Sequence, residues 1–266
     1  MTDTGHITAL NRAAWDASAP LHGTGPAWDA LCRGFRDRTF SVFDETMTAA
    51  LNAAGVQGAR VVQIGCNNGR ETLSALALGA SEALGIDQSN AFLDQARTLA
   101  DLSPHSADFL CADIYALPAD TPRDFDIAFI TIGVINWMPD LGAFFAAVAG
   151  LLRPGGQLVI YETHPMLEMF DPNSATPDLP AFSYFQSTPH IETGVITYDG
   201  TRADADTQGH WYIHTLGAIV QAGIDAGLRL TTLREFAQSN REVDYDIYEN
   251  RSAQIPMSYL MRVVRT

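Results

Sequence analysis

From residue 60 onward, short apolar runs alternate with longer amphipathic segments. The runs are four to six residues long and poor in charge, and they cover residues 60–64, 82–86, 107–111, 127–132 and 158–161. Between them, apolar residues recur at helical spacing over residues 71–78, 91–100 and 141–152. Alternation of this kind is typical of a parallel sheet that helices cover on both faces.

Further elements are predicted on either side of this region. Asp3 or Thr4 can cap a helix that runs through Trp15, and a Pro- and Gly-rich stretch at 20–26 interrupts it. A second helix is expected over 41–54, because Gly55 is a typical stop signal. Near the C-terminus, we expect a helix and then two strands. They cover residues 211–226, 228–235 and 259–264.

Residues 163–210 break the alternation, with five prolines and several aromatic side chains. A connection this long inside a compact domain is usually a functional element, so we expect a small β-rich lid over the carboxyl edge of the sheet. The predicted fold is α/β: a seven-stranded, mostly parallel, Rossmann-like sheet with helices on both faces. An N-terminal helical cap (residues 1–55) precedes a main domain (56–266), which carries the lid insertion after its fifth strand.

Charge and cysteine content restrict the functional class. The sequence holds 16 basic residues, all Arg, and 31 acidic ones, a net charge of −15. Chemistry that needs a lysine is therefore excluded, and binding to nucleic acid or an anionic membrane is disfavoured. Three widely spaced cysteines, no signal-peptide pattern and no long apolar run favour a cytoplasmic protein. We expect a monomer or a homodimer.

The most informative motif spans residues 61–71, where a strand runs into Gly65-x-x-x-Gly69 and then directly into a helix. Glycine lets the backbone approach a ligand closely, and a helix N-terminus presents free N–H groups. The next strand ends at Asp87, and an acid at that distance can accept hydrogen bonds from both hydroxyls of a ribose. A ribose-containing ligand is predicted.

The same motif argues against a dinucleotide. Asn67 stands where the fingerprint GxGxxG requires its second glycine, so a pyrophosphate would fit poorly. A nicotinamide oxidoreductase is therefore the least favoured interpretation. S-adenosylmethionine (SAM), which has a ribose and a carboxylate but no pyrophosphate, fits better.

With these features, the sequence resembles the class I SAM-dependent methyltransferases of the small-molecule type over about residues 60–162. Residues 64–69 resemble the glycine-rich first motif, 85–89 the ribose motif and 111–114 the adenine-side motif. Residues 125–129 and 151–156 resemble the fourth strand and the turn before the fifth. The resemblance implies that residues 56–266 form a SAM-binding domain. The cofactor residues implied are Trp15, Gln63, Gly65, Cys66, Asn67, Gly69, Asp87, Gln88, Ser89, Asp113, Ile114 and Thr131.

The sequence departs from the family pattern at two positions. Gln63 stands where the family usually has an acid, which would cost a charge-assisted bond to the ammonium of SAM, about 1 kcal/mol. Asn67 replaces a glycine, but Asn tolerates the left-handed conformation that the turn needs. Trp15 is expected either to face the sulfonium as a cation–π partner or only to anchor its helix.

The resemblance implies methyl transfer that yields S-adenosylhomocysteine and works mainly by proximity and orientation. His164, directly after the fifth strand, and His210, at the end of the lid, are the candidate catalytic bases. His210 and His214 are spaced i, i+4, but no third ligand is visible, so we expect no metal site.

The acceptor is expected to be a small molecule. The (Asn/Asp/Ser)-Pro-Pro-(Tyr/Phe) motif of adenine and glutamine methylation is absent, as is the Pro-Cys pair of cytosine-C5 enzymes. The alternative is a non-catalytic SAM-binding module or partner subunit, which the departures at Gln63 and Asn67 would suit.

Overall fold

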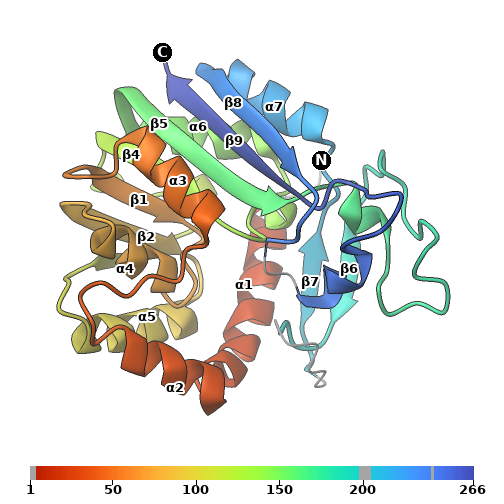
Figure 1. The fold of residues 1–266 in the computed structure, drawn as a ribbon, viewed down its shortest axis with the longest axis horizontal. Coiled ribbons are helices and arrows are strands. Elements are labelled where there is room, and N and C mark those ends of the chain that lie inside the picture. Colours follow the sequence, from red (N-terminus) through yellow and green to blue (C-terminus); the bar gives the residue numbers. More distant parts are fainter. Residues whose placement is uncertain (1–3, 198–204, 241–242) are drawn as a thin grey trace.

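A computed structural model of the chain describes residues 4–197, 205–240 and 243–266. Its centre is a seven-stranded sheet with the order β3-β2-β1-β4-β5-β9-β8 (Figure 1). These strands are β1 (Arg60–Ile64), β2 (Glu82–Asp87), β3 (Asp108–Cys111), β4 (Phe125–Ile130), β5 (Leu152–Thr163), β8 (Leu228–Phe236) and β9 (Ser258–Arg265). Strands β1 to β5 run parallel to one another, whereas β9 is antiparallel to both β5 and β8. The predicted fold class is confirmed.

The helices connect these strands and precede them. The α-helices are α1 (Thr4–His22), α2 (Gly25–Gly34), α3 (Glu45–Ala54), α4 (Arg70–Ala77), α5 (Asn90–Leu102), α6 (Leu141–Leu151) and α7 (Leu216–Asp225). Short 3-10 helices are η1 (Ile114–Ala116), η2 (Ile135–Trp137), η3 (Leu167–Met169) and η4 (Val243–Tyr248). None of the helices in the described ranges combines the length and hydropathy needed to cross a bilayer.

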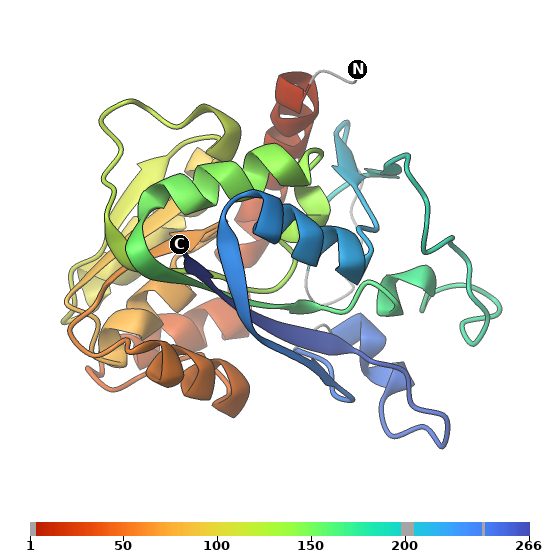
Figure 2. The ribbon, with the colours of Figure 1, turned by 90° about the horizontal axis from the view of Figure 1, so that it is seen from above.

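Helices cover both faces of the sheet, α6 and α7 on one side and α3, α4 and α5 on the other (Figure 2). Alternate residues of one strand supply the two cores, since successive side chains point to opposite faces. Val62 and Ile64 pack in the cluster that includes Phe144 of α6, whereas Val61 packs with Leu51 of α3. Burial on both faces explains why the strands read as continuous apolar runs.

Of two sequence predictions in the outer regions, one was confirmed and one was wrong. The stretch at 20–26 does interrupt the helix: α1 ends at His22 and α2 begins at Gly25, while Pro20 lies in the last turn of α1, where only one backbone hydrogen bond is lost. Asp3, a candidate cap for that helix, lies outside the described residues. The helix expected from Trp211 begins only at Leu216, where the side chain of Thr215 caps it by accepting from Ala218 N. Trp211 instead ends a strand.

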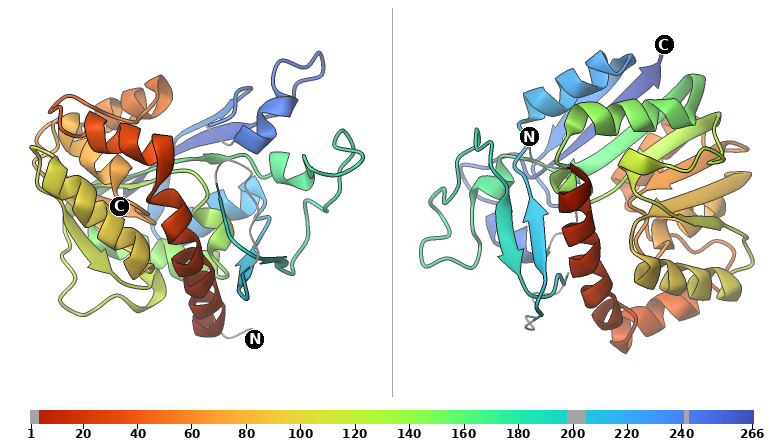
Figure 3. Two further views of the ribbon diagram at one scale, coloured as in Figure 1. Left: turned by 90° about the horizontal axis from the view of Figure 1, so that it is seen from below. Right: turned by 180° about the vertical axis from the view of Figure 1, so that it is seen from behind.

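The lid contains a two-stranded antiparallel hairpin, β6 (His190–Thr193) and β7 (Gln208–Trp211). The predicted lid range also included residues 198–204, which lie outside the described residues. Helix α1 lies between this hairpin and the body of the sheet, as opposite views show (Figures 1 and 3). The N-terminal helix and the lid therefore form a joint cover at the carboxyl edge of the parallel strands.

One buried side chain joins three parts of this cover. Asn11 of α1 is fully buried and accepts from the backbone N–H of His210 at 2.7 Å. Its Nδ2 donates to the carbonyl of His210 at 3.0 Å and to that of Trp137 at 3.3 Å. A single carboxamide thus fixes α1 to both β7 and η2.

We expect Asn11→Ala to lower the free energy of unfolding by about 2–4 kcal/mol, because it removes three hydrogen bonds and leaves a buried N–H without its acceptor. Denaturant melts would measure the change. Arg12→Ala, at the exposed neighbouring position, is the control and should change stability by less than about 0.5 kcal/mol. Equal losses in the two variants would contradict the role of Asn11.

Candidate functional site

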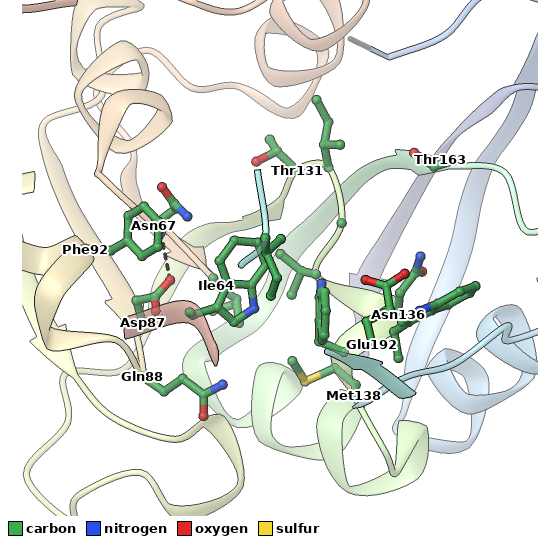
Figure 4. Close-up of a pocket in the computed structure, with 18 of the residues that line it drawn as sticks. Ile64, Asn67, Asp87, Gln88, Phe92, Thr131, Asn136, Met138, Thr163 and Glu192 are labelled. Atoms are coloured by element: carbon green, nitrogen blue, oxygen red, sulfur yellow. Dashed lines mark hydrogen bonds between the residues drawn. The ribbon is translucent and has the colours of Figure 1, made fainter. Parts of the chain in front are cut away.

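A cavity of about 650 Å³ opens at the carboxyl edge of β1, β2 and β4, underneath α1 and the lid. Its two ends are lined by different segments (Figure 4). Asn67, Asp87 and Gln88 lie at the inner end, where Asp87 ends β2 and the other two lie on the turns after β1 and β2. Asn136 and Glu192 lie at the outer end, toward the lid. Thr131, which follows β4, lines the cavity as well.

The turn between β1 and α4 brings backbone to the cavity wall. Gly65 has a φ of 67°, and a Cβ there would lie 2.6 Å from Cγ2 of Val134, so only glycine fits. Asn67 has a φ of 50°, the left-handed conformation that its residue type was expected to tolerate. Gly69 is the N-cap residue of α4. The turn therefore directs a helix N-terminus toward the cavity.

Asp87 holds the two inner turns together. Its carboxylate accepts from the backbone N–H of Asn67 and from that of Ser89, both at 2.8 Å. Burial is the largest influence on its pKa and raises it, as does nearby Asp16, while the two N–H bonds lower it. A carboxylate offers about four lone-pair sites, so this one keeps acceptor capacity for a ligand in the cavity.

The adenine-side motif also reaches the cavity. Asp113 and Ile114 both line it, and Asp113 accepts from Tyr115 N at 3.0 Å through one oxygen. Its other oxygen accepts from the hydroxyl of Thr8 in α1 at 2.6 Å. Thr8 was not predicted from the sequence, because nothing in the spacing of α1 indicates which residues meet a strand end more than a hundred residues away.

Trp15 lines the cavity from α1. Its ring makes edge contacts with Phe92 of α5 at 5.9 Å and with Trp137 of η2 at 5.4 Å between centroids. The ring therefore anchors α1 and borders the cavity at once, so the two roles expected for Trp15 are compatible.

The structure divides the predicted cofactor residues into two groups. Those that line the cavity are Trp15, Gly65, Asn67, Asp87, Gln88, Asp113, Ile114 and Thr131. Four others are absent from its wall: Gln63, Cys66, Gly69 and Ser89. Ser89 and Cys66 are fully buried; Ser89 caps α5 by accepting from Phe92 N and donates to Asp16 at 2.6 Å. These four residues therefore do not face the cavity.

Gln63 is engaged inside the core. Its side chain is 1% exposed. The amide oxygen Oε1 accepts from the hydroxyl of Thr72 at 2.6 Å, and the amide nitrogen Nε2 donates to the hydroxyl oxygen of Thr131 at 3.3 Å. Thr131 is in turn part of the cavity wall. The amide thus reaches a ligand only through Thr131.

His164 lies outside the cavity wall, with both ring nitrogens engaged. Nδ1 accepts from the backbone N–H of Met166 at 3.0 Å, and Nε2 lies 2.9 Å from a carboxylate oxygen of Glu235. Burial lowers the pKa of His164, and Glu235 raises it in part. This geometry positions the chain after β5, and it gives no support to a proton transfer inside the cavity.

His210 is likewise absent from the cavity wall, since its strand neighbour Trp211 faces the cavity instead. Because Trp211 lies in a strand, the helical spacing assumed for His210 and His214 does not apply. His214 makes a hydrogen bond to the carbonyl of Met138 at 2.8 Å. Within the described residues, no group of three or more His, Cys, Asp or Glu side chains could hold a metal ion.

A buried carboxylate at the end of β5 shapes the loop after β4. Glu162 is 2% exposed and accepts from the backbone N–H groups of Gly133, Val134 and Ile135, at 2.8 Å for Val134 and 3.2 Å for Ile135. Gly133 and Val134 line the cavity. Glu162 was not among the residues predicted for the site, although a lone acid ending an apolar strand was the available signal.

We expect Glu162→Ala to destabilise the fold by about 3 kcal/mol or more, because three buried donors lose their acceptor. Glu162→Gln should cost about half as much, since Oε1 alone serves Val134 and Ile135. Denaturant melts of both variants would measure this order. If Glu162→Gln proved as destabilising as Glu162→Ala, the contribution of Glu162 to stability would come from its charge and not from the hydrogen bonds that an amide oxygen can keep.

The outer end of the cavity combines aromatic and acidic side chains, which were predicted only as part of an aromatic lid and not residue by residue. Glu168 of η3 is 3% exposed and accepts from Nδ2 of Asn136. Together with Glu162, Glu168 raises the pKa of Tyr259, although burial of the phenol is the larger cause. The rings of Phe170, Phe182 and Trp211 complete this end.

Comparison with known proteins agrees with this geometry. Residues 61–156 match the family model described as a methyltransferase domain. A ubiquinone biosynthesis O-methyltransferase of Bradyrhizobium sp. (strain ORS 278) is 31% identical over 162 residues, 58% of each chain. The chain therefore spans a little over half the length of the curated relatives it matches.

Solved structures share the fold at lower identity. A SAM-dependent methyltransferase from Mesorhizobium loti has a TM-score of 0.56 at 23% identity and covers 82% of this chain and 96% of its own. A Burkholderia thailandensis 1,6-didemethyltoxoflavin-N1-methyltransferase, solved with bound 1,6-didemethyltoxoflavin and S-adenosylhomocysteine, has a TM-score of 0.58 at 15% identity and covers 100% of this chain and 92% of its own.

The sheet order, the turn after β1 and the domain match define a methyltransferase domain. Residues 61–156 thus match a methyltransferase domain, and the sheet has the fold of SAM-dependent methyltransferases of class I, as the sequence motifs predicted.

Proposed function

We propose that this protein transfers the methyl group of SAM to a small-molecule acceptor. The main support is the position of Asp87: it ends β2, faces the cavity and ties the turn after β1 to the turn after β2. In this arrangement its carboxylate would accept hydrogen bonds from the ribose hydroxyls. Asp113 and Ile114 would meet the adenine, and the turn at Gly65 the amino acid portion.

The residues of the cavity fit such a ligand. The volume of about 650 Å³ is within the range of small-molecule sites, about 300–1,000 Å³. When bound, SAM supplies an activated methyl group on a positively charged sulfur. The protein would contribute position: α1 and the lid, which line the cavity, would exclude water and hold an acceptor at the outer end next to the methyl group.

A general base is required only where the acceptor must lose a proton during the transfer. His164 and His210 remain hypotheses for this role, but neither lines the cavity in this structure. Glu168 and Glu192 do line it, and Glu168 is the buried one of the two. We propose that proximity and orientation carry most of the rate enhancement, with a carboxylate of the outer end receiving any proton.

The alternative is a SAM-binding module without turnover. The departures at Gln63 and Asn67 motivated it, yet Asn67 adopts the left-handed conformation that the turn needs. Gln63 is satisfied by Thr72 and Thr131 inside the core. Both substitutions are thus accommodated structurally, which favours the enzyme over the module.

We also propose a cytoplasmic role in small-molecule metabolism. The cysteines Cys32, Cys66 and Cys111 are all free, which suits a reducing compartment. Burial raises the pKa of the Cys66 thiol well above its ordinary value, so this cysteine is a packing residue and not a nucleophile.

We expect Asp87→Ala to raise the Kd for S-adenosylhomocysteine about 10- to 100-fold, because it removes charge-assisted hydrogen bonds to the ribose. Isothermal titration calorimetry would measure this. Asp94→Ala is the control, because Asp94 is an exposed acid on the neighbouring helix α5, paired with Arg97. Unchanged affinity in a folded Asp87→Ala protein would contradict the placement of the ligand.

The pKa of Asp87 adds a pH-dependent prediction. The ionised carboxylate is the better acceptor, and burial raises its pKa, so affinity for S-adenosylhomocysteine should fall as the pH drops through that raised value. The fall should begin at a higher pH than an exposed Asp would give. Titrations across mildly acidic pH would show it, and in Asp87→Asn the same curve should be flat. A wild-type curve as flat as that of Asp87→Asn would contradict this prediction.

Turnover separates the enzyme from the non-catalytic module. Incubation with SAM labelled on its methyl group and fractions of a metabolite extract should give S-adenosylhomocysteine and a labelled small product, identified by mass. Tight SAM binding with no product from any fraction would favour the module.

A further inference from the structure

The outer end of the cavity is walled by aromatic rings from distant parts of the chain. They are Trp137 of η2, Phe170 after η3, Phe182 of the lid, Trp211 of β7 and Tyr245 of η4. Each ring is only partly buried in the structure and borders the cavity. Rings gathered in this way leave aromatic surface facing the space next to the proposed methyl donor.

Two of these rings, Phe182 and Trp211, pack against the imidazole ring of His190. Trp211 stacks on His190 with 4.1 Å between centroids and an interplanar angle of 18°. Phe182 contacts His190 edge to face at 4.5 Å and Trp211 at 6.0 Å. Burial lowers the pKa of His190, which favours the neutral ring. The stacked and edge-to-face contacts make this aromatic surface of the lid preorganised.

The opposite side is fixed independently. Trp137 meets Trp15 edge to face, and its backbone carbonyl accepts from the buried Asn11. Because α1 and the lid hold these rings from two directions, little side-chain entropy remains to be lost when a ligand enters.

From this arrangement we infer that the methyl acceptor is a planar aromatic molecule, with Phe182 and Trp211 as specificity-determining residues. The inference rests on the proposed function. Flat rings gain edge-to-face and offset-stacked contacts with such walls in addition to the burial of area, whereas an aliphatic acceptor gains area alone. Neighbouring Asn136, Glu168 and Glu192 supply polar groups that would orient a hydroxyl or amino substituent.

The inference is tested by ligand binding to protein saturated with S-adenosylhomocysteine, so that the readout is independent of turnover. Two matched pairs serve as probes: para-hydroxybenzoate with its cyclohexane analogue, and tyramine with its cyclohexane analogue. Each pair keeps the polar substituents and changes only the planarity and aromaticity of the ring. Using both pairs separates preference for a ring from preference for a charge.

We expect the aromatic member of at least one pair to bind about three- to tenfold tighter than its saturated analogue. Phe182→Ala should abolish that preference, and so should Trp211→Leu if the first variant folds poorly. Phe185→Ala is the matched control, because Phe185 is an aromatic of the same lid that is 82% exposed and outside the cavity wall. It should keep the wild-type preference.

Three results would overturn the inference: equal or tighter binding of the saturated members, no binding by any probe, or an aromatic preference unaffected by both lid variants. Failure of the proposed function is recognised separately, in the first step. If S-adenosylhomocysteine itself does not bind, the proposed function fails, whereas if it binds and the aromatic preference is absent, only the acceptor class is wrong.

Discussion

The carboxylate of Asp87 is the contact on which the inner half of the site depends. By accepting from Asn67 N and Ser89 N, it joins two turns that leave adjacent parallel strands. It adds to the backbone bonds that Gly65 and Cys66 donate to Ile86 of β2, and it also orders Ser89, the residue that caps α5. The same oxygens face the cavity, so the group that builds the site is also the one that would bind the ribose.

Helix α1 connects this inner half with the outer one. Thr8 bonds to Asp113 and Asp16 bonds to Ser89, both at the carboxyl edge that would hold SAM. On its other side, Asn11 bonds to β7, and Ser18 accepts from Ile196 N of the lid at 2.8 Å. One helix thus contacts both the region that would hold SAM and the region that would hold the acceptor. A change that disorders α1 would therefore affect both regions.

The central fold could be predicted because its strands are buried on both faces and therefore read as apolar runs. The outer regions could not, since their structure depends on contacts between distant segments. Trp211 has the periodicity of a helix but lies in a strand, where it pairs with His190 across the hairpin.

The site shows the same division. Turn residues such as Gly65, Asn67 and Asp87 were predictable, because backbone conformation and strand ends restrict their type. Thr8 was not, since only the folded chain brings it near Asp113, and for Glu162 the only signal was an acid at the end of an apolar strand. For His164, its place after β5 suggested a base; that role stays a hypothesis, and in the structure Met166 and Glu235 occupy both ring nitrogens.

The account assigns the space between the ends of β1 and β2 to an adenosyl amino acid, and a crystal structure of the protein grown with S-adenosylhomocysteine tests it most directly. The account predicts density with the ribose on Asp87, the adenine beside Asp113 and Ile114, and the sulfur directed toward the aromatic outer end. Density at another place, or a crevice left empty at saturating ligand, would contradict it.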